Sequence, residues 1–193
     1  TYIYNPIAVD IAPKADIKSK KIIAMGRLNA QKGFDLLIEA WTKLEPDFKD
    51  WEVNIFGEGL LKEQLQKQID NKKLKKIYLR GYSKDVSKDM AESSIFVFSS
   101  RYEGFGLVLL EAQAIGLPCV SFNCKEGPAE IIDNGVNGFL VEPLNVDLLA
   151  EKMRALMENE ELRKQFSKKS TKDLGRFERR RIMDKWDKLL SEI

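Results

Sequence analysis

The stretch SSRYEGFGLVLLEAQA, Ser99–Ala114, decides the fold predicted for this chain. It follows an apolar run, Ile95–Phe98, that is typical of a buried strand. It then crosses a short glycine-bearing loop that holds Glu103 and enters a segment of helical composition, Leu107–Ile115. A strand, a glycine loop and a helix in this order direct unpaired backbone N–H groups and the positive end of a helix dipole at one place. The stretch therefore predicts an anion site at the start of the helix.

Two carboxylates flank the start of this helix, Glu103 before it and Glu111 in its second turn. Nearly every other side chain of the helix is apolar, which is typical of a buried helix. We therefore expect Glu111 where an ionised carboxylate is unfavourable unless it is paired or hydrogen-bonded. Two interpretations stay open. Glu111 lies on a narrow solvent-facing edge beside Gln113, or it is positioned to accept hydrogen bonds from sugar hydroxyls.

The composition describes an ordinary globular protein and excludes several kinds of chemistry. The 193 residues include 32 basic and 30 acidic side chains, a net charge of +2, so no bulk charge favours nucleic acid or a membrane. Histidine is absent, which excludes Ser-His, Cys-His and His-metal chemistry from this chain alone. Cys119 and Cys124 have no accompanying ligands, so we expect reduced thiols in the cytoplasm and no zinc site. No apolar run approaches about 18 residues, and no signal-peptide pattern is present.

Apolar runs that alternate with helical segments predict the architecture. Strands are expected at Ile22–Met25, Trp51–Phe56, Ile77–Leu79, Ile95–Phe98, Cys119–Phe122 and Phe139–Val141, and from Val146 to the end the pattern predicts helix, broken near Gly175. This alternation predicts an α/β fold, a doubly wound parallel six-stranded sheet of Rossmann-like type with helices on both faces. Ligands of such a sheet bind beyond the carboxyl ends of its strands. The loops expected at that edge contain Gly26, Gly57, Gly81 and Gly104–Gly106.

The loop after the first strand supplies the cations that an anion site needs. It contains neither a dinucleotide-binding fingerprint nor a phosphate-binding P-loop pattern. Arg27 and Lys32 instead flank a turn between Gly26 and Gly33. Arginine donates paired hydrogen bonds to phosphate oxygens and lysine carries a mobile charge. Together with the helix start at Gly106 they predict a diphosphate clamp, although Lys32 by itself is equally well interpreted as a solvated surface charge.

The carboxylates do not form a metal site in the predicted arrangement. No D-x-D pair is present, so we expect no metal ion held by two neighbouring carboxylates, and no other cofactor. A diphosphate leaving group would then be stabilised by Arg27, Lys32 and backbone dipoles, which is electrostatic catalysis.

Four motifs in register resemble one protein family. They are Gly26-Arg27…Lys32-Gly33, Phe56-Gly57-Glu58-Gly59, Glu103-Gly104-Phe105-Gly106…Glu111-Ala112 and Gly127-Pro128-Ala129-Glu130-Ile131-Ile132…Gly135…Asn137-Gly138. In order and spacing they resemble the retaining, nucleotide-sugar-dependent glycosyltransferases of the GT-B fold (family 4, group 1). The similarity covers about residues 1–160. Members of that family have two Rossmann-like domains, and this chain resembles the C-terminal, donor-binding one.

The resemblance implies a role for each matching residue. Arg27 and Lys32 would hold the diphosphate and Glu103 would contact the transferred sugar, so these three are the expected catalytic residues. Glu111 would bind the ribose hydroxyls. Tyr82 would lie near the base, and Glu130 matches a position for which a helix-start role and a ligand role both stay open. The other expected donor-binding positions are Gly26, Gly57, Phe105, Gly106 and Leu107.

The resemblance also implies that the chain is half of such an enzyme. Residues 1–19 would lead in from a missing N-terminal domain, and residues 20–175 would form the nucleotide-sugar-binding domain. The helix within residues 176–193 would pack back on the missing domain, where the acceptor site would lie. We expect this half to bind the donor but to transfer sugar poorly or not at all.

The expected activity is metal-independent, retaining transfer of a sugar to a glycan or lipid-linked acceptor. A UDP-sugar is the favoured donor and GDP-mannose the second, with the identity of the sugar left open. The alternatives are a sugar-nucleotide epimerase or phosphorylase of the same fold, and a non-catalytic nucleotide-binding or scaffold module. Nucleic acid is not an expected partner. Arg176 and Arg179–Arg181 could contact anionic lipid at the cytoplasmic face of a membrane, but a solvated helix face is the favoured interpretation.

Overall fold

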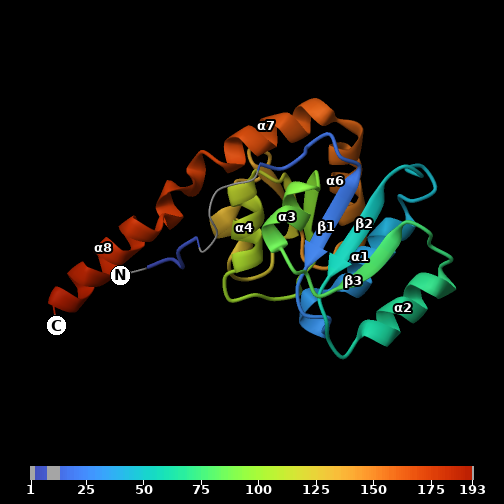
Figure 1. The fold of residues 1–193 in the computed structure, drawn as a ribbon, viewed down its shortest axis with the longest axis horizontal. Coiled ribbons are helices and arrows are strands. Elements are labelled where there is room, and N and C mark those ends of the chain that lie inside the picture. The colour runs from blue at the N-terminus through green and yellow to red at the C-terminus, as the bar shows by residue number, and fades with distance from the viewer. Residues whose placement is uncertain (1–2, 8–13, 193) are drawn as a thin grey trace.

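A parallel sheet forms the centre of the molecule (Figure 1). The computed structural model describes residues 3–7 and 14–192. Six strands lie in the order β3-β2-β1-β4-β5-β6, and every neighbouring pair is parallel. Their bounds are β1 Lys21–Met25, β2 Glu52–Phe56, β3 Ile77–Gly81, β4 Ile95–Phe98, β5 Cys119–Phe122 and β6 Gly138–Val141. The predicted doubly wound, Rossmann-like sheet is confirmed.

Helices cover both faces of this sheet, because its central strands are apolar on both sides. Along β1, Ile22 and Ala24 pack into one hydrophobic cluster while Ile23 and Met25 pack into the other. The first cluster includes side chains of α1 Phe34–Thr42, α2 Lys62–Asn71, α6 Val146–Glu158 and α7 Glu160–Ser170. The second includes side chains of α3 Val86–Ala91, α4 Leu107–Ile115 and α5 Pro128–Ile131.

The strand order reverses between β1 and β4, which places a crevice beside them. The chain leaves β1 toward α1 on one face and leaves β4 toward α4 on the other. The two loops therefore diverge at the carboxyl ends of adjacent strands, and the space between them is where ligands of open α/β sheets bind. A short 3-10 helix, Ala30–Lys32, lies in the first of these loops.

The prediction of helix from Val146 to the end, broken only near Gly175, is wrong in one respect. Besides the predicted break near Gly175, the helix is interrupted at Asn159, between α6 and α7. Asn159 is extended, with φ −121° and ψ 93°, and its side chain accepts a hydrogen bond from the N–H of Leu162. An asparagine that caps the next helix in this way ends the one before it. The chain then continues through a 3-10 helix, Asp173–Phe177, into α8, Arg179–Ser191.

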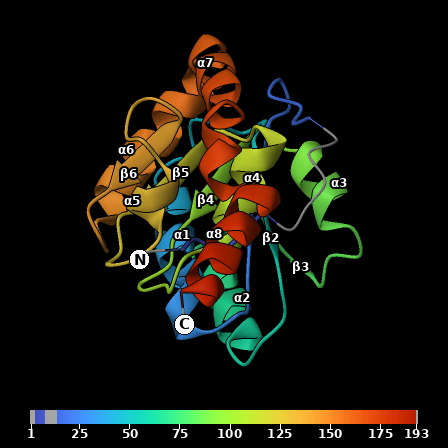
Figure 2. The same ribbon diagram turned by 90° about the vertical axis from the view of Figure 1, so that its left-hand side faces the viewer.

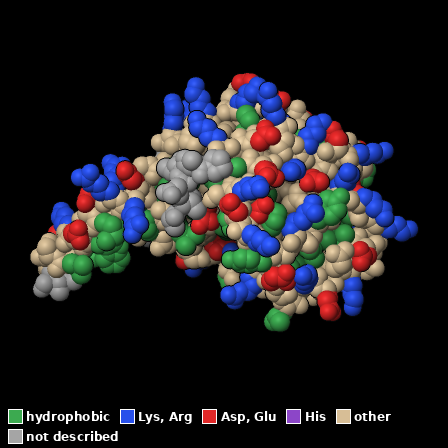
Figure 3. Space-filling model, in the orientation of Figure 1, with side chains coloured by type: hydrophobic (Ala, Val, Ile, Leu, Met, Phe, Trp, Pro, Cys, Tyr) green, Lys and Arg blue, Asp and Glu red, His purple; other side chains and the backbone are tan. Residues whose placement is uncertain are grey.

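The helix α8 extends away from the sheet, toward the viewer in Figure 2. Its first turn is fixed by Ile182, which is buried, and by the N–H of Ile7, which donates to the carbonyl oxygen of Phe177 just before the helix at 3.0 Å. Apolar side chains gather on the extended arm in Figure 3, where Met183, Trp186 and Leu190 are 48%, 44% and 63% exposed. Residues 3–7 run nearby without forming a helix or strand. Of the expected lead-in segment, residues 1–2 and 8–13 lie outside the described residues.

Among the described residues, none of the helices combines the length and the apolar character that crossing a bilayer requires.

Candidate functional site

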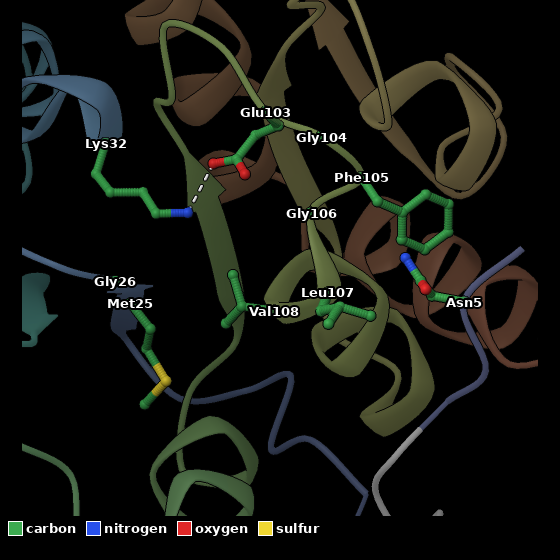
Figure 4. Close-up of a pocket in the computed structure, with 10 residues that line it drawn as sticks. All are labelled: Asn5, Met25, Gly26, Lys32, Glu103, Gly104, Phe105, Gly106, Leu107 and Val108. Atoms are coloured by element: carbon green, nitrogen blue, oxygen red, sulfur yellow. Dashed lines mark hydrogen bonds and ion pairs between the residues drawn. The ribbon is translucent and has the colours of Figure 1, made fainter.

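A pocket of about 610 Å³ lies at the carboxyl ends of β1 and β4 (Figure 4). Its walls come from the loop after β1, from the loop after β4 with the start of α4, and from the N-terminal segment. The lining residues are Asn5, Met25, Gly26, Lys32, Glu103, Gly104, Phe105, Gly106, Leu107 and Val108. We call this space the first pocket. It contains six of the ten predicted site residues: Gly26, Lys32, Glu103, Phe105, Gly106 and Leu107.

The loop after β1 is folded so that Lys32 is directed into the first pocket. The side chain of Asn29 accepts a hydrogen bond from the N–H of Lys32 at 3.3 Å, which closes the 3-10 turn. Gly33 then adopts φ +61°, and a Cβ there would lie 2.0 Å from the carbonyl oxygen of Ser99. Only glycine permits this close approach, so the loop packs directly on the end of β4.

Lys32 and Glu103 meet in the first pocket and form an ion pair. The Nζ of Lys32 lies 2.7 Å from Oε1 of Glu103, and the two side chains are only 18% and 8% exposed. The ammonium group also lies 5.4 Å from the ring centroid of Phe98. Figure 4 shows the two side chains pointing toward one another from separate loops. Two residues that the sequence assigned to different parts of a donor are therefore partners in the structure.

The start of α4 faces the same space. Gly106 precedes the helix with φ +91°, and the nine-residue helix begins at Leu107. The N–H groups of Leu109 and Leu110 donate to the carbonyl oxygen of Gly106, so those of Leu107 and Val108 are the ones without an acceptor in the helix, at the positive end of its dipole. Leu107 and Val108 both line the first pocket. An anion bound there would interact with these groups and with the ammonium of Lys32.

A second pocket of about 300 Å³ adjoins the first. Its lining residues are Met25, Gly26, Arg27, Phe56, Gly57, Glu58, Tyr82, Ser83 and Val86. Met25 and Gly26 line both pockets, which shows that the pockets are neighbours. A Cβ at Gly57 would lie 1.8 Å from the carbonyl oxygen of Gly26, so the backbones of the two loops are in direct contact.

The structure therefore separates the two predicted cations. Lys32 lies in the first pocket, whereas Arg27 is exposed and lines the second. Tyr82 lies in the second pocket with 82% of its surface exposed, so its ring is free to pack on a flat group. The geometry suits a ligand that extends from one pocket into the other, with its anionic part near Gly26.

Glu111 lies one turn into α4 and lines neither of these two pockets. Burial raises the pKa of its carboxyl group above the ordinary value. Within the described part of the chain it makes no hydrogen bond or ion pair. Of the two interpretations left open for Glu111, a solvent-facing edge shared with Gln113 is not what the structure has, because Gln113 is buried and donates to the carbonyl oxygen of Asn137 at 3.0 Å. Glu111 is a half-buried acceptor without a partner, on the helical face that also carries Leu107 and Val108.

Four lining residues of the first pocket are not among the predicted site residues: Asn5, Met25, Gly104 and Val108. Asn5 comes from the N-terminal segment and lies beside Phe105 in Figure 4, and Val108 follows Leu107 in α4. A helical pattern could have placed Val108 next to Leu107, but no local signal indicates where Asn5 lies. Glu130, for which two roles stayed open, lies in the first turn of α5 and lines neither pocket.

The cysteines are buried and unpaired. Burial raises the pKa of Cys119 to about 12, so this thiol stays protonated at neutral pH. Burial, and then the negative charge of Glu103, also raise the pKa of Cys124. Among the described residues, no group of three or more His, Cys, Asp or Glu side chains is placed to hold a metal ion.

Comparison with known proteins identifies the family. Residues 10–173 match the family described as glycosyl transferases group 1. An exopolysaccharide phosphotransferase of Streptomyces coelicolor is 35% identical over 193 residues, which are 99% of this chain and 20% of that protein. A poly(ribitol-phosphate) alpha-N-acetylglucosaminyltransferase of Staphylococcus aureus is 31% identical over 187 residues, 95% of this chain and 38% of that protein.

The fold is also that of a solved relative. A mutant of S. aureus TarM, in complex with fondaparinux, alpha-GlcNAc-glycerol and UDP, superposes with a TM-score of 0.93 at 30% identity, and the match covers 98% of this chain and 39% of that one. This chain thus spans less than half the length of these relatives. The family match extends over most of the chain and the sheet is that of GT-B enzymes. The chain therefore belongs to the glycosyl transferases group 1.

Proposed function

We propose that this chain is the donor-binding domain of a retaining, metal-independent glycosyltransferase that takes a sugar from a nucleoside-diphosphate sugar. The observation that carries the proposal is the first pocket, where Lys32, Glu103 and the start of α4 face one space. A cation and a helix N-terminus bind an anion, and a carboxylate beside them accepts hydrogen bonds from hydroxyl groups.

The roles of the residues follow from this placement. The diphosphate would lie at Gly26 and the start of α4, where Lys32 exchanges its contact with Glu103 for a phosphate oxygen. Glu103 is then released to accept hydrogen bonds from the transferred sugar. Arg27 would reach the diphosphate from the second pocket, and Tyr82 would pack on the base there. Glu111, which has an unused acceptor on the adjoining helical face, would bind the ribose hydroxyls.

Charge stabilisation is the catalytic principle of this arrangement. When the bond from sugar to diphosphate breaks, negative charge develops on the leaving phosphate. The ammonium of Lys32, the guanidinium of Arg27 and the N–H groups of α4 are the groups positioned to stabilise it. Desolvation in the first pocket strengthens each of these interactions.

UDP is the favoured nucleotide, and GDP is the second candidate. Support comes from the structural relative TarM, whose crystals contain UDP. The acceptor would be a glycan or a lipid-linked glycan, as the S. aureus relative is named for transfer to poly(ribitol-phosphate). It would bind mainly through a second domain, which the greater length of the relatives supports. The domain by itself would then bind the donor and transfer sugar poorly.

The protein is proposed to work in the cytoplasm, because its two buried thiols are unpaired, as in a reducing compartment. A membrane contact through the C-terminal arginines is less well supported. Arg176 packs on the ring of Phe177 at 5.0 Å, and Arg181 donates to the carbonyl oxygen of Gly175 at 3.2 Å. Two of the four arginines considered for lipid are thus engaged within the chain.

Calorimetric titration of this chain with UDP, GDP and ADP tests the proposal. We expect one nucleotide to bind near micromolar affinity, and Lys32→Ala and Glu111→Ala each to weaken it by at least tenfold, about 1.4 kcal/mol. Glu63→Ala, on an exposed residue of α2 that lines neither pocket and to which no role in binding is assigned, is the control and should bind as the wild type does. Absence of binding by all three nucleotides would contradict the proposal for this chain. Binding that neither variant weakens would contradict the assigned site.

A further inference from the structure

Arg101 connects three parts of the chain and lines neither pocket. It lies two residues before Glu103, in the loop that follows β4. Its Nη1 and Nη2 donate to the two carboxylate oxygens of Asp35 in α1, at 2.8 Å and 2.6 Å. The same Nη1 donates to the carbonyl oxygen of Ala30 at 2.9 Å, and the backbone N–H of Arg101 donates to the carbonyl oxygen of Gln31 at 2.7 Å.

Further hydrogen bonds continue this contact between the two loops. The hydroxyl of Ser99 donates to the carbonyl oxygen of Lys32 at 2.9 Å, and Nε2 of Gln31 donates to the carbonyl oxygen of Tyr102 at 3.1 Å. The ion pair of Lys32 with Glu103 completes the series. Each residue of the loop segment 30–32 is therefore bonded to the segment 99–103. The ion pair of Lys32 with Glu103 is one of these contacts.

The geometry at Arg101 is specific for a guanidinium group. Two parallel N–H groups meet both oxygens of one carboxylate, while the backbone carbonyl of Ala30 takes a further bond. Burial by itself would raise the pKa of Asp35, but the hydrogen bond and charge of Arg101 outweigh it and hold that pKa below its ordinary value. The pair is only partly exposed, so solvent screens it less than a surface ion pair. A lysine would supply the charge but not the paired donors.

We propose that Arg101 is a positioning residue, which ties the loop after β1 to α1 and to the loop after β4 and so holds Lys32 and Glu103 ready at the first pocket. The inference rests on the proposed donor-binding function and extends it to a residue that does not touch the donor. Without Arg101 the loop gains freedom, and binding the diphosphate must restrict that freedom again. The loss should therefore appear in affinity and in local order.

The test uses Arg101→Gln, Arg101→Lys and a matched control, Arg154→Gln. Arg154 also forms an arginine–aspartate ion pair, 2.7 Å from Asp47, but on α6 and away from both pockets. Titration with UDP, or with GDP if the wild type binds that instead, is done well below the melting temperature of each variant. We expect Arg101→Gln to weaken binding about fivefold or more, Arg101→Lys to recover only part of it, and Arg154→Gln to stay within about twofold of the wild type.

Hydrogen exchange separates positioning from general stability. The N–H groups of Lys32 and Gly33, which donate to the carbonyl oxygens of Asn29 and Ala30, should exchange faster in Arg101→Gln and not in Arg154→Gln. Equal nucleotide affinity of Arg101→Gln and the wild type would overturn the inference and leave the proposed function intact. The inference would also be overturned if Arg154→Gln lowered the nucleotide affinity as much as Arg101→Gln does. It would be overturned as well if Arg101→Lys bound the nucleotide as tightly as the wild type. Absence of binding by the wild type would refute the proposed function itself, and the inference with it.

Discussion

The ion pair of Lys32 with Glu103 has consequences for stability as well as for binding. Glu103 is almost buried, and Lys32 is the cation that compensates its charge. Lys32→Ala leaves a desolvated carboxylate without a partner, so we expect a loss of roughly 1–3 kcal/mol in the free energy of unfolding. Urea denaturation at pH 7 measures it.

A second substitution tests the cause of that loss. Glu103→Gln in the Lys32→Ala background removes the unpaired charge and should recover about half of the lost free energy or more. If the double variant instead loses the sum of what Lys32→Ala and Glu103→Gln each lose in unfolding free energy, the carboxylate is solvated well enough by itself. The pair then does not stabilise the fold.

Lys32 is expected to support both stability and binding, whereas Glu111 is expected to support binding at a cost in stability. Burial raises the pKa of this carboxyl group in the folded protein. A raised pKa favours the protonated form, so the stabilisation is complete below the ordinary pKa of 4.5 and is lost as the pH rises through the folded value. At pH 7 the ionised Glu111 therefore destabilises the domain, and Glu111→Gln should raise the melting temperature.

The same variant should weaken nucleotide binding about tenfold, because an amide accepts hydrogen bonds from ribose hydroxyls less strongly than a carboxylate does. Scanning calorimetry at pH 4 and pH 7 compares the two proteins, and the gain in melting temperature should shrink at the lower pH. A variant that is less stable than the wild type at pH 7 would show that Glu111 has a stabilising partner.

At the scale of secondary-structure elements, α5 and the loop before α4 are held together by a glycine. Gly127 precedes α5 with φ +93°, and a Cβ there would lie 1.9 Å from the carbonyl oxygen of Phe105. Gly127→Ala must displace backbone in addition to straining its own, so we expect a loss of roughly 2 kcal/mol or more and weaker donor binding. Thermal unfolding measures the first effect and titration the second.

Gly104→Ala is the matched control for this prediction. Gly104 lies in the same loop region, but nothing approaches its hypothetical Cβ within 4 Å. Its unfolding free energy should stay within about 0.5 kcal/mol of the wild type. Similar losses in both variants would mean that the loop itself, and not its contact with Gly127, limits stability.

The ends of helices and strands were predicted accurately where the flanking residues interrupt the pattern, and inaccurately where they do not. The bounds of β4, α4 and β5 are those predicted, because each apolar block is bordered by serine, asparagine, glycine or proline, which interrupt helices and strands locally. The break at Asn159 was missed because the residues around it are polar and helix-forming on both sides. Its capping role becomes visible only when the N–H of Leu162 is seen to donate to it.

At the scale of the whole molecule, the sequence predicts which loops meet at the candidate site but not which side chains pair there. Parallel strands bring their following loops to one edge, and this placed Lys32, Glu103 and the start of α4 together in advance. The pairs themselves join residues far apart in the chain: Lys32 and Glu103 are 71 positions apart, and Arg101 and Asp35 are 66. Such contacts depend on side-chain geometry in the folded state, for which a single sequence has no local pattern.

The exposed face of α8 leads to a prediction about a longer protein that also contains the proposed second domain. Met183, Trp186 and Leu190 follow the spacing of one helical face, and an exposed apolar stripe of this kind marks a contact surface. Of the three tryptophans, Trp41 and Trp51 are 0% and 3% exposed, so Trp186 is the one that a collisional quencher can reach in this chain. Acrylamide should therefore quench the emission of Trp186 far more than that of the two buried tryptophans.

In a protein of the full length of its relatives, the second domain proposed above would cover this stripe. Trp186 should then be protected from acrylamide, and its emission should shift to shorter wavelength because its surroundings become apolar. Trp186→Ser should leave nucleotide binding by this chain unchanged but lower the transferase activity proposed for such a longer protein, since the two domains would no longer be held in register. If Trp186 is quenched equally in both proteins, the stripe on α8 does not contact the second domain.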